Sequence, residues 1–195
     1  HQIAIFGSSH TGENSPLYKE AYEVCKKLAE AGYVIVDGGG PGVMRAASLG
    51  AKNGGGKVIG VTFQADTRMH FEGKDPSNKV DVEIKTDNYL ERTLTILKEA
   101  DCYIIFKGGT GTISEFAMAG GRAKLYFGHH KPLIFFGSFW ENIMRALEEN
   151  LEIDRQEEST YVVVTSPKEA LEAIKYLDKK IQANHEHHAK GPFKL

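Results

Sequence analysis

The stretch CYIIFKGGTGTISEF, residues 102–116, decides the fold because it joins an apolar run, a glycine-rich turn and a helix-like segment. A run that is apolar at nearly every position is typical of a strand covered on both faces. Other short apolar runs, several of them apolar at nearly every position, lie at residues 2–6, 33–37, 57–63, 82–86, 132–136 and 161–165, with helix-period segments between them. This alternation predicts a doubly wound, Rossmann-like α/β fold, with a mainly parallel sheet of about seven strands and helices on both faces.

The length and the composition bound the number of domains. With 195 residues, of which 41% are hydrophobic and 26% charged, the chain can form one sizeable core. We expect a single domain over residues 1–184. The polar segment HEHHAKGPFKL, residues 185–195, lacks an apolar period and is expected to be a mobile tail. Its histidines have no evident structured partner ligand, so we expect no physiological metal site there.

The charge and the cysteines narrow the classes of partner. A formal net charge of -2 offers no basic field for a nucleic-acid polymer or a membrane surface. Cys25 and Cys102 fit neither a metal-ligand spacing nor a disulfide framework, which suits a reducing cytoplasm. No secretory leader and no apolar run near the roughly 18 residues of a membrane span are evident. We therefore expect a cytoplasmic protein whose partner is a small molecule.

Three glycine-rich turns follow predicted strands, at residues 7–12, 38–44 and 108–112. In doubly wound sheets ligands bind where loops leave the carboxyl ends of the strands. Glycine lets backbone N–H groups approach an anion closely, and the helix that follows directs its positive end to the same place. We therefore expect a phosphate at the amides of Gly109 to Thr112, with Gly38 to Gly40 opposite.

The familiar nucleotide-binding motifs are absent. The dinucleotide fingerprint G-x-G-x-x-G would need glycine at Ser114 or at Arg45, depending on where it began. The Walker loop would need glycine at Ala51 and Ser or Thr at Val58. The sequence supports neither a dehydrogenase nor a nucleoside triphosphatase.

Glu115 and Arg92 each have a structural interpretation as well as a functional one. Thr112 and Glu115 match the capping box S/T-x-x-E, so that Glu115 could serve only to cap a helix. Arg92 lies in a predicted helix, where most charged side chains are solvated. Neither residue indicates a function when it is considered alone.

Together, these motifs resemble the LOG (LONELY GUY) family of cytokinin-activating enzymes. The resemblance rests on GGGPGVM at 38–44, on Arg92 ahead of AD at 100–101, and on GGTGTISE at 108–115. The family signature PGGxGTxxE is matched at every named position after the first. The resemblance implies a Rossmann-like dimer that hydrolyses the N-glycosidic bond of a nucleoside 5'-monophosphate, such as AMP or a cytokinin riboside monophosphate. The products would be the free base and ribose 5-phosphate.

The resemblance also implies roles for individual residues. Arg92 and Glu115 would be catalytic, and no metal or organic cofactor would be needed. A carboxylate at the position of Glu115 could stabilise an oxocarbenium-like transition state or activate water. The expected phosphate- and substrate-binding residues are Ser8, Gly39, Thr93, Gly108, Gly109, Thr110, Gly111 and Thr112.

Two departures from the family pattern leave an alternative open. Lys107 replaces the leading proline of the signature, and Thr93 replaces the second basic residue of an Arg-Lys pair. Molybdenum-cofactor carriers resemble the same scaffold and hold a phosphate-bearing ligand without hydrolysing it. The alternative function is therefore a carrier of this kind, or a nucleotide sensor that binds without turnover.

Two further segments bear on assembly and on the substrate. The predicted helix at 113–127 carries more apolar side chains than one sheet face covers, which predicts a homodimer, although burial inside one domain would also explain it. The long connection at 63–81 is either a lid or a surface loop, and we expect it to contribute walls of the base pocket.

Overall fold

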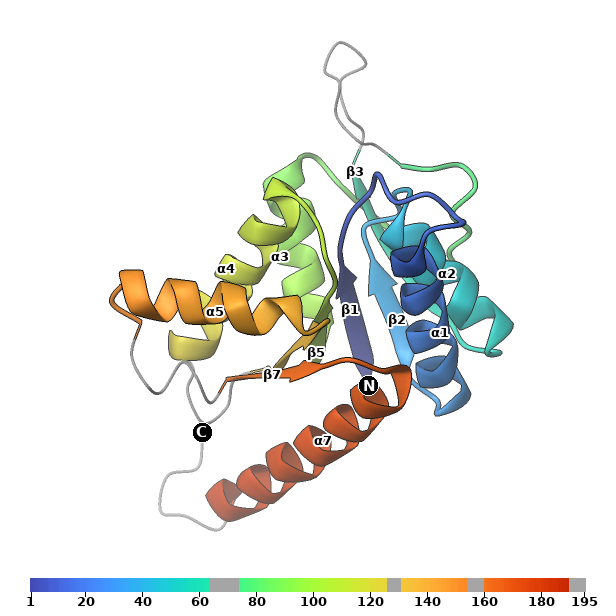
Figure 1. Ribbon diagram of the computed structural model, residues 1–195. Coiled ribbons are helices and arrows are strands. Elements are labelled where there is room, and N and C mark those ends of the chain that lie inside the picture. Colours follow the sequence, from blue (N-terminus) through green and yellow to red (C-terminus); the bar gives the residue numbers. More distant parts are fainter. Residues whose placement is uncertain (64–73, 126–130, 154–159, 190–195) are drawn as a thin grey trace.

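The computed structural model describes residues 1–63, 74–125, 131–153 and 160–189 (Figure 1). Seven strands form one sheet in the order β4-β3-β2-β1-β5-β6-β7, and every neighbouring pair is parallel. This arrangement confirms the predicted doubly wound fold. The strands are β1 (Gln2–Phe6), β2 (Val34–Asp37), β3 (Val58–Phe63), β4 (Val82–Thr86), β5 (Cys102–Ile105), β6 (Leu133–Phe136) and β7 (Tyr161–Val164).

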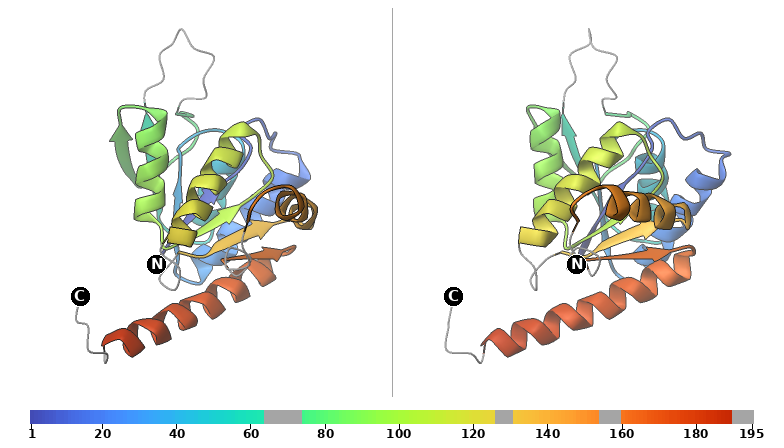
Figure 2. Two further views of the ribbon diagram at one scale, coloured as in Figure 1. Left: turned by 90° about the vertical axis from the view of Figure 1, so that its left-hand side faces the viewer. Right: turned by 60° about the vertical axis from the view of Figure 1, so that its left-hand side comes forward.

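Helices cover both faces of the sheet, as Figures 1 and 2 show from three directions. They are α1 (Pro16–Glu30), α2 (Val43–Asn53), α3 (Tyr89–Glu99), α4 (Thr110–Leu125), α5 (Phe139–Asn150) and α7 (Pro167–Ala189). One core cluster joins the sheet to α1, α2 and α7, for example through Leu28, Ala47 and Ile174. The other cluster joins the opposite face to α3, α4 and α5, for example through Leu97 and Trp140.

The sheet reverses its order on either side of β1. Ala4 of β1 pairs with Val36 of β2 on one side and with Tyr103 of β5 on the other. The chain therefore leaves β1 toward one edge of the sheet and later returns to build the other edge from β5. The helices that follow β1 and β5 pack on opposite faces of the sheet, and doubly wound folds open a ligand-binding crevice at such a point.

Local sequence signals set the starts of α1 and α3. Ser15 caps α1 by accepting a hydrogen bond from Tyr18 N at 3.2 Å, and Pro16 occupies the first turn. Asn88 caps α3 in the same way through Glu91 N at 3.0 Å. These caps fix where α1 and α3 begin relative to the strands before them.

Two predicted segments differ from the structure or extend beyond its described part. The helix predicted at 113–127 begins three residues earlier, at Thr110, and its last two residues lie outside the described part. Helix α7 continues to Ala189, across the predicted boundary at 184/185, and the mobility of residues 185–195 stays a prediction. Among the described residues no helix is both long and apolar enough to cross a membrane.

Candidate functional site

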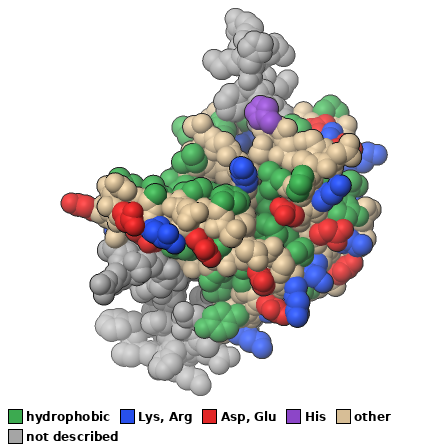
Figure 3. All heavy atoms as spheres, viewed as in Figure 1, with side chains coloured by type: hydrophobic (Ala, Val, Ile, Leu, Met, Phe, Trp, Pro, Cys, Tyr) green, Lys and Arg blue, Asp and Glu red, His purple; other side chains and the backbone are tan. Residues whose placement is uncertain are grey.

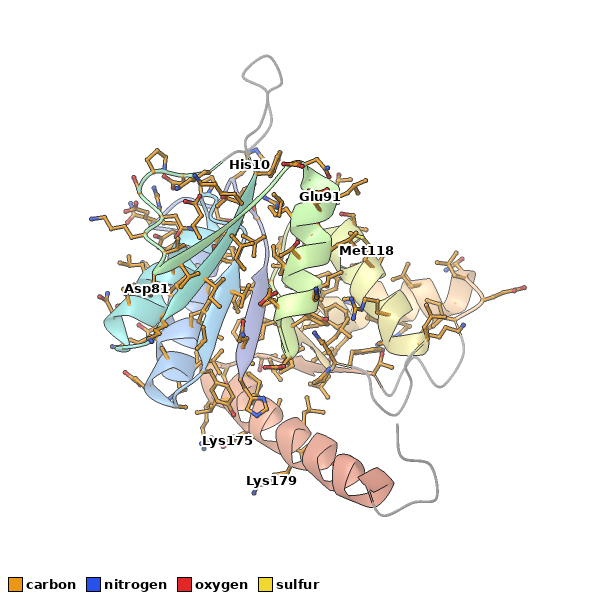
Figure 4. All side chains as sticks on the ribbon, turned by 180° about the vertical axis from the view of Figure 1, so that it is seen from behind. His10, Asp81, Glu91, Met118, Lys175 and Lys179 are labelled. Carbon is orange, nitrogen blue, oxygen red and sulfur yellow. The ribbon has the colours of Figure 1, made fainter. Side chains whose placement is uncertain are left out.

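A cavity of about 360 Å³ lies at the carboxyl edge of the sheet, between the loops that follow β1 and β5. Its walls come from the turn at 7–10, from Gly38 and Met44 near β2, from α3, and from the start of α4. Figure 4 shows His10 and the first turn of α3, marked by Glu91, at this same edge of the molecule. Segments far apart in the sequence thus meet at the predicted switch point.

The first turn of α4 forms one wall of the cavity. Ile113 N donates to Gly109 O at 3.1 Å, so Gly109 stands at the cap position and Thr110 begins the helix. Gly109, Thr110, Gly111 and Thr112 all line the cavity. The first amide groups of a helix have no carbonyl partner within the helix, and they carry the positive end of its dipole. This wall is therefore suited to an anion such as phosphate.

Arg92 of α3 and Glu115 of α4 approach each other in the wall of the cavity. Both side chains are buried, and Arg92 Nη2 lies 3.6 Å from Glu115 Oε1. The guanidinium carbon of Arg92 lies 5.3 Å from the ring centre of Phe63 and 5.1 Å from that of Tyr89. Arg92 Nε has no hydrogen-bond partner among the described residues. A fixed cation with donor capacity to spare therefore borders the cavity.

Burial changes the proton affinity of Glu115. Loss of solvation raises the pKa of its carboxyl to about 7, although the charge of Arg92 acts in the opposite direction. A carboxyl group with a pKa near neutrality can both accept and release a proton under physiological conditions. This property is the one required of a general acid or base.

The two structural interpretations of these residues are wrong. Glu115 lies in the second turn of α4, because the helix begins at Thr110, and it cannot complete a capping box with Thr112 at the helix start. Arg92 is buried with about 7% of its surface exposed, so it is not a solvated helix residue. The spacing Thr-x-x-Glu therefore arises inside the helix.

The structure brings most of the predicted binding residues to the cavity, but not all of them. Ser8 lines it, together with the four residues of the α4 turn. Gly39 lies behind the wall at a φ of 67°, and its position would place a Cβ 2.5 Å from Thr62 Cγ2. Thr93 is fully buried and donates to Tyr89 O at 3.1 Å, so its side chain supports α3.

Gly108 has a packing role next to the cavity. A Cβ at this position would overlap the hydroxyl of Thr112 and would lie 3.1 Å from Ser8 N. Ser8 N donates to Lys107 O at 3.0 Å, which ties the loop after β1 to the loop after β5. Glycine at 108 therefore allows the two loops to approach closely enough to form the crevice.

Lys107, which replaces the proline of the family signature, faces a second cavity. This cavity has a volume of about 780 Å³ and is lined also by Gly108, Ser138 and Phe139. The ammonium of Lys107 lies 5.9 Å from the ring centre of Phe139. Lys107 does not line the cavity that contains Arg92 and Glu115.

Several residues of the site were missed in the sequence. Tyr89 lines the cavity, and its hydroxyl lies 2.7 Å from Ser114 Oγ. It precedes Arg92 by three positions, so helical spacing alone would have placed both on one face. His10 and Met44 also line the cavity. They belong to the glycine-rich stretches at 7–12 and 38–44, where the sequence pointed to the glycines as ligand-binding residues but not to these two side chains. Among the described residues, no group of three acidic, histidine or cysteine side chains gathers as a metal site.

The fold and the site define a class: a Rossmann-like α/β protein with a candidate anion-binding crevice at the switch point of its sheet. Within that class, the chain belongs to the SLOG cluster4 family, whose model matches residues 1–171. The resemblance to LOG proteins is thereby confirmed.

The relatives whose names state a function fall into two groups. It is 34% identical over 137 residues to an uncharacterised protein of Archaeoglobus fulgidus, covering 70% of this chain and 84% of that one. It is 28% identical over 180 residues to a probable cytokinin riboside 5'-monophosphate phosphoribohydrolase, LOGL6 of Oryza sativa subsp. japonica, covering 89% of this chain and 70% of the relative. Among solved structures, the molybdenum cofactor binding protein of Rippkaea orientalis matches with a TM-score of 0.67 at 26% identity, covering 90% of this chain and 96% of that one.

Proposed function

We propose that the protein hydrolyses the N-glycosidic bond of a nucleoside 5'-monophosphate, either AMP or a cytokinin riboside monophosphate, to the free base and ribose 5-phosphate. The observation that carries this proposal is the buried pair of Arg92 and Glu115 beside the amide-rich start of α4. The names of the plant relatives supply the substrate class.

The 5'-phosphate binds at the start of α4 in this proposal. The amides of Thr110 to Thr112 and the hydroxyl of Thr112 supply hydrogen bonds, and Arg92 supplies a charge-assisted contact. Gly39 and Gly108 act indirectly, because they allow the neighbouring turns to pack closely. Thr93 holds α3 rather than the substrate, since its hydroxyl is engaged by Tyr89 O.

Glu115 acts on the sugar in this proposal. The bond between C1′ and the base nitrogen breaks with its electron pair moving to the base, and positive charge develops on the ribose. Ionised Glu115 stabilises that charge and takes a proton from the water that adds to C1′. The proton then passes to the departing base, which balances the reaction without any cofactor. A pKa of about 7 suits this exchange.

A second candidate is a protein that carries a phosphate-bearing ligand without hydrolysing it. The solved structure with a TM-score of 0.67 is named as a molybdenum cofactor binding protein, and it is matched over almost its whole length. Because Thr93 stands where the family pattern has a second basic residue, Arg92 is the cation that the described part of α3 contributes to the cavity wall. A wall with fewer cations gives less stabilisation to charge that develops in a transition state, which suits binding without turnover.

The proposed partner is a small molecule, and the proposed assembly is a homodimer in the cytoplasm. Figure 3 shows acidic and basic side chains interspersed over the described part of one face, with no extended basic patch on it. Cys25 and Cys102 are buried free thiols, which suits a reducing compartment.

One assay separates hydrolase from carrier. Purified protein is incubated with AMP and, separately, with its N6-isopentenyl derivative, and free base and ribose 5-phosphate are quantified by chromatography. Equal amounts of both products, lost in the Glu115→Gln variant, support the hydrolase. Saturable AMP binding without release of base over a long incubation supports the carrier instead.

A further inference from the structure

Tyr89 is the first residue of α3 and lines the cavity, and the proposed reaction assigns it no role. Its side chain is half-buried and contacts two other parts of the wall. The ring borders the guanidinium of Arg92, and the hydroxyl lies 2.7 Å from Ser114 Oγ of α4. Because α3 and α4 lie side by side (Figure 2), this one side chain spans the two helices that carry the candidate catalytic pair.

The ring of Tyr89 contributes to the placement of Arg92. The guanidinium carbon lies 5.1 Å from the centre of that ring and 5.3 Å from the centre of the Phe63 ring, which is within the range of cation–π attraction. Glu115 Oε1 lies 3.6 Å from Arg92 Nη2, too far for a hydrogen bond, and Arg92 Nε has no hydrogen-bond partner among the described residues. The direction in which the guanidinium points therefore depends strongly on the two rings.

The hydroxyl of Tyr89 begins a short chain of hydrogen bonds into the first turn of α4. Ser114 Oγ donates to Gly111 O at 2.8 Å. A serine hydroxyl has a single proton, so Tyr89 is the donor in the 2.7 Å contact between the two hydroxyl groups. The direct distance from the Tyr89 hydroxyl to Gly111 O is 3.5 Å, which is long for such a bond. The chain therefore runs from Tyr89 through Ser114 to the carbonyl of Gly111.

The carbonyl of Gly111 and the amide of Thr112 belong to one planar peptide unit. A hydrogen bond accepted by the carbonyl polarises that unit and makes its N–H a stronger donor. Thr112 lines the cavity and lies in the first turn of α4, where amide groups lack a carbonyl partner within the helix. The chain from Tyr89 thus ends at an amide that the proposed function assigns to the phosphate.

We propose that Tyr89 is a positioning residue that joins the cation of the site to its anion-binding turn. Its ring orients Arg92, and its hydroxyl, through Ser114, holds and polarises the turn that carries the Thr112 amide. A phosphate group that contacts both Arg92 and this turn is thereby held in one place. The effect on a phosphate-bearing ligand rests on the proposed function, whereas the two links made by Tyr89 can be tested without any ligand.

The first experiment examines the ligand-free protein by ¹⁵N NMR. The Arg92 Nε–H resonance is assigned by its loss in Arg92→Lys, and it reports on the rings beside the guanidinium. We expect Tyr89→Leu to shift this resonance and Tyr89→Phe, which keeps the ring, to leave it almost unchanged. The Thr112 amide resonance should shift in both variants, because both lack the hydroxyl at the head of the chain.

The second experiment measures affinity for AMP by calorimetry. Tyr89→Phe should weaken AMP binding about 2- to 10-fold, the range expected for one hydrogen bond. Ser114→Ala removes the middle of the same chain and should weaken binding by at least as much. The double variant should lose little more than Ser114→Ala alone, since effects within one network are not additive. Tyr176→Phe, which removes a hydroxyl from an exposed tyrosine of α7, is the matched control and should bind AMP as the wild type does.

A purely structural role of Tyr89 would give a different pattern. Tyr89→Phe would then lower the melting temperature without shifting the Thr112 amide, and its effect on AMP binding would add to that of Ser114→Ala. If base is released by the wild type, we expect Tyr89→Phe to raise KM with little change in kcat, because the ring still holds Arg92 beside Glu115. Tyr89→Leu should lower kcat as well.

The outcomes for Tyr89 and for the hydrolase are separable. An unshifted Arg92 Nε–H resonance in Tyr89→Leu, an unshifted Thr112 amide in Tyr89→Phe, or wild-type affinity for AMP in Tyr89→Phe overturns the positioning role. If the resonances shift and AMP binding weakens as expected but no base is ever released, the hydrolase proposal fails while the role of Tyr89 in holding the ligand stands. If Tyr89→Leu does not fold, the Thr112 amide and the AMP affinities of Tyr89→Phe and Ser114→Ala still decide the matter.

Discussion

At the scale of single residues, burial gives Glu115 and Arg92 their chemistry. An exposed glutamate would have an ordinary pKa and an exposed arginine would be a mobile surface charge. Here the two lie 3.6 Å apart with little solvent around them, and aromatic rings border the guanidinium. The same low solvation that costs stability makes each charge effective toward a substrate.

The first prediction concerns catalysis by Glu115. Glu115→Gln keeps the shape of the side chain and removes its charge, so we expect turnover of AMP to fall by on the order of 10²-fold or more. Affinity for AMP should change much less, because the phosphate binds at the start of α4. Turnover and AMP affinity are measured in parallel, and undiminished turnover would end the catalytic assignment.

The second prediction concerns stability and pH at the same residue. The pKa of Glu115 is raised in the folded protein, so ionisation of its carboxyl group opposes folding. The stability of the fold therefore decreases as the pH rises from the ordinary pKa of a glutamate through about 7. Glu115→Gln avoids this loss. We expect the variant to melt a few degrees above the wild type at pH 8 and close to it at pH 5. Calorimetry at both pH values checks this, and a lower melting temperature at pH 8 would contradict it.

The third prediction concerns the glycine turn. Gly39→Ala places a Cβ at a φ of 67° and 2.5 Å from Thr62 Cγ2, so we expect a loss of about 1–3 kcal/mol of stability. Gly12→Ala is the matched control, because its Cβ would meet nothing within 4 Å and its φ is not in the left-handed region. Urea denaturation of both variants provides the comparison, and equal midpoints would show that the turn tolerates a side chain.

At the scale of elements, α4 shows where prediction from the sequence succeeds and where it fails. The apolar runs identified all seven strands, because the inner parallel strands need apolar residues on both faces, although β4 at the edge of the sheet is only partly buried. The start of α4 was placed too late, since Thr110 and Gly111 are weak helix formers and packing on Ser8 and Tyr89 decides otherwise. The meeting of Arg92 and Glu115 in a buried pair could not be found in the sequence, because it depends on how α3 and α4 pack.

The fourth prediction uses the unusual composition of α4. Gly120 and Gly121 lie inside the helix, and a Cβ on either would meet nothing within 4 Å. Gly121→Ala should therefore stabilise the monomer fold by about 0.5–1 kcal/mol, through helix propensity alone. Ala117→Gly, on the exposed side of the same helix, should cost a similar amount. Chemical denaturation measures both, and destabilisation by Gly121→Ala would show that something packs against it.

At the scale of the whole molecule, apolar side chains are exposed on two adjacent helices. Leu90 and Leu94 on α3 and Ile113 on α4 are each more than half exposed, and Figure 2 shows α3 and α4 side by side in both views. Large exposed apolar side chains grouped on one face are typical of an interaction surface. The proposed homodimer would use this face.

The fifth prediction tests that dimer. Light scattering at micromolar protein should give a mass near twice 21.5 kDa for the wild type and near 21.5 kDa for Leu94→Asp. Tyr176→Asp on α7 is the control, since Tyr176 is 66% exposed but lies on a different helix. A wild-type mass near 21.5 kDa would exclude the dimer at that concentration.

The central place of β1 in the sheet has a consequence for synthesis of the chain. Strands β1 to β4 and their helices can assemble as soon as they leave the ribosome, but one edge of β1 stays open until residues 102–105 arrive. An unpaired strand edge is a template for association with other chains. The crevice, with one wall from residues 7–10 and the other from 109–115, comes into being only when that edge closes. We therefore expect a nascent chain to be most prone to aggregate just before its candidate site is complete.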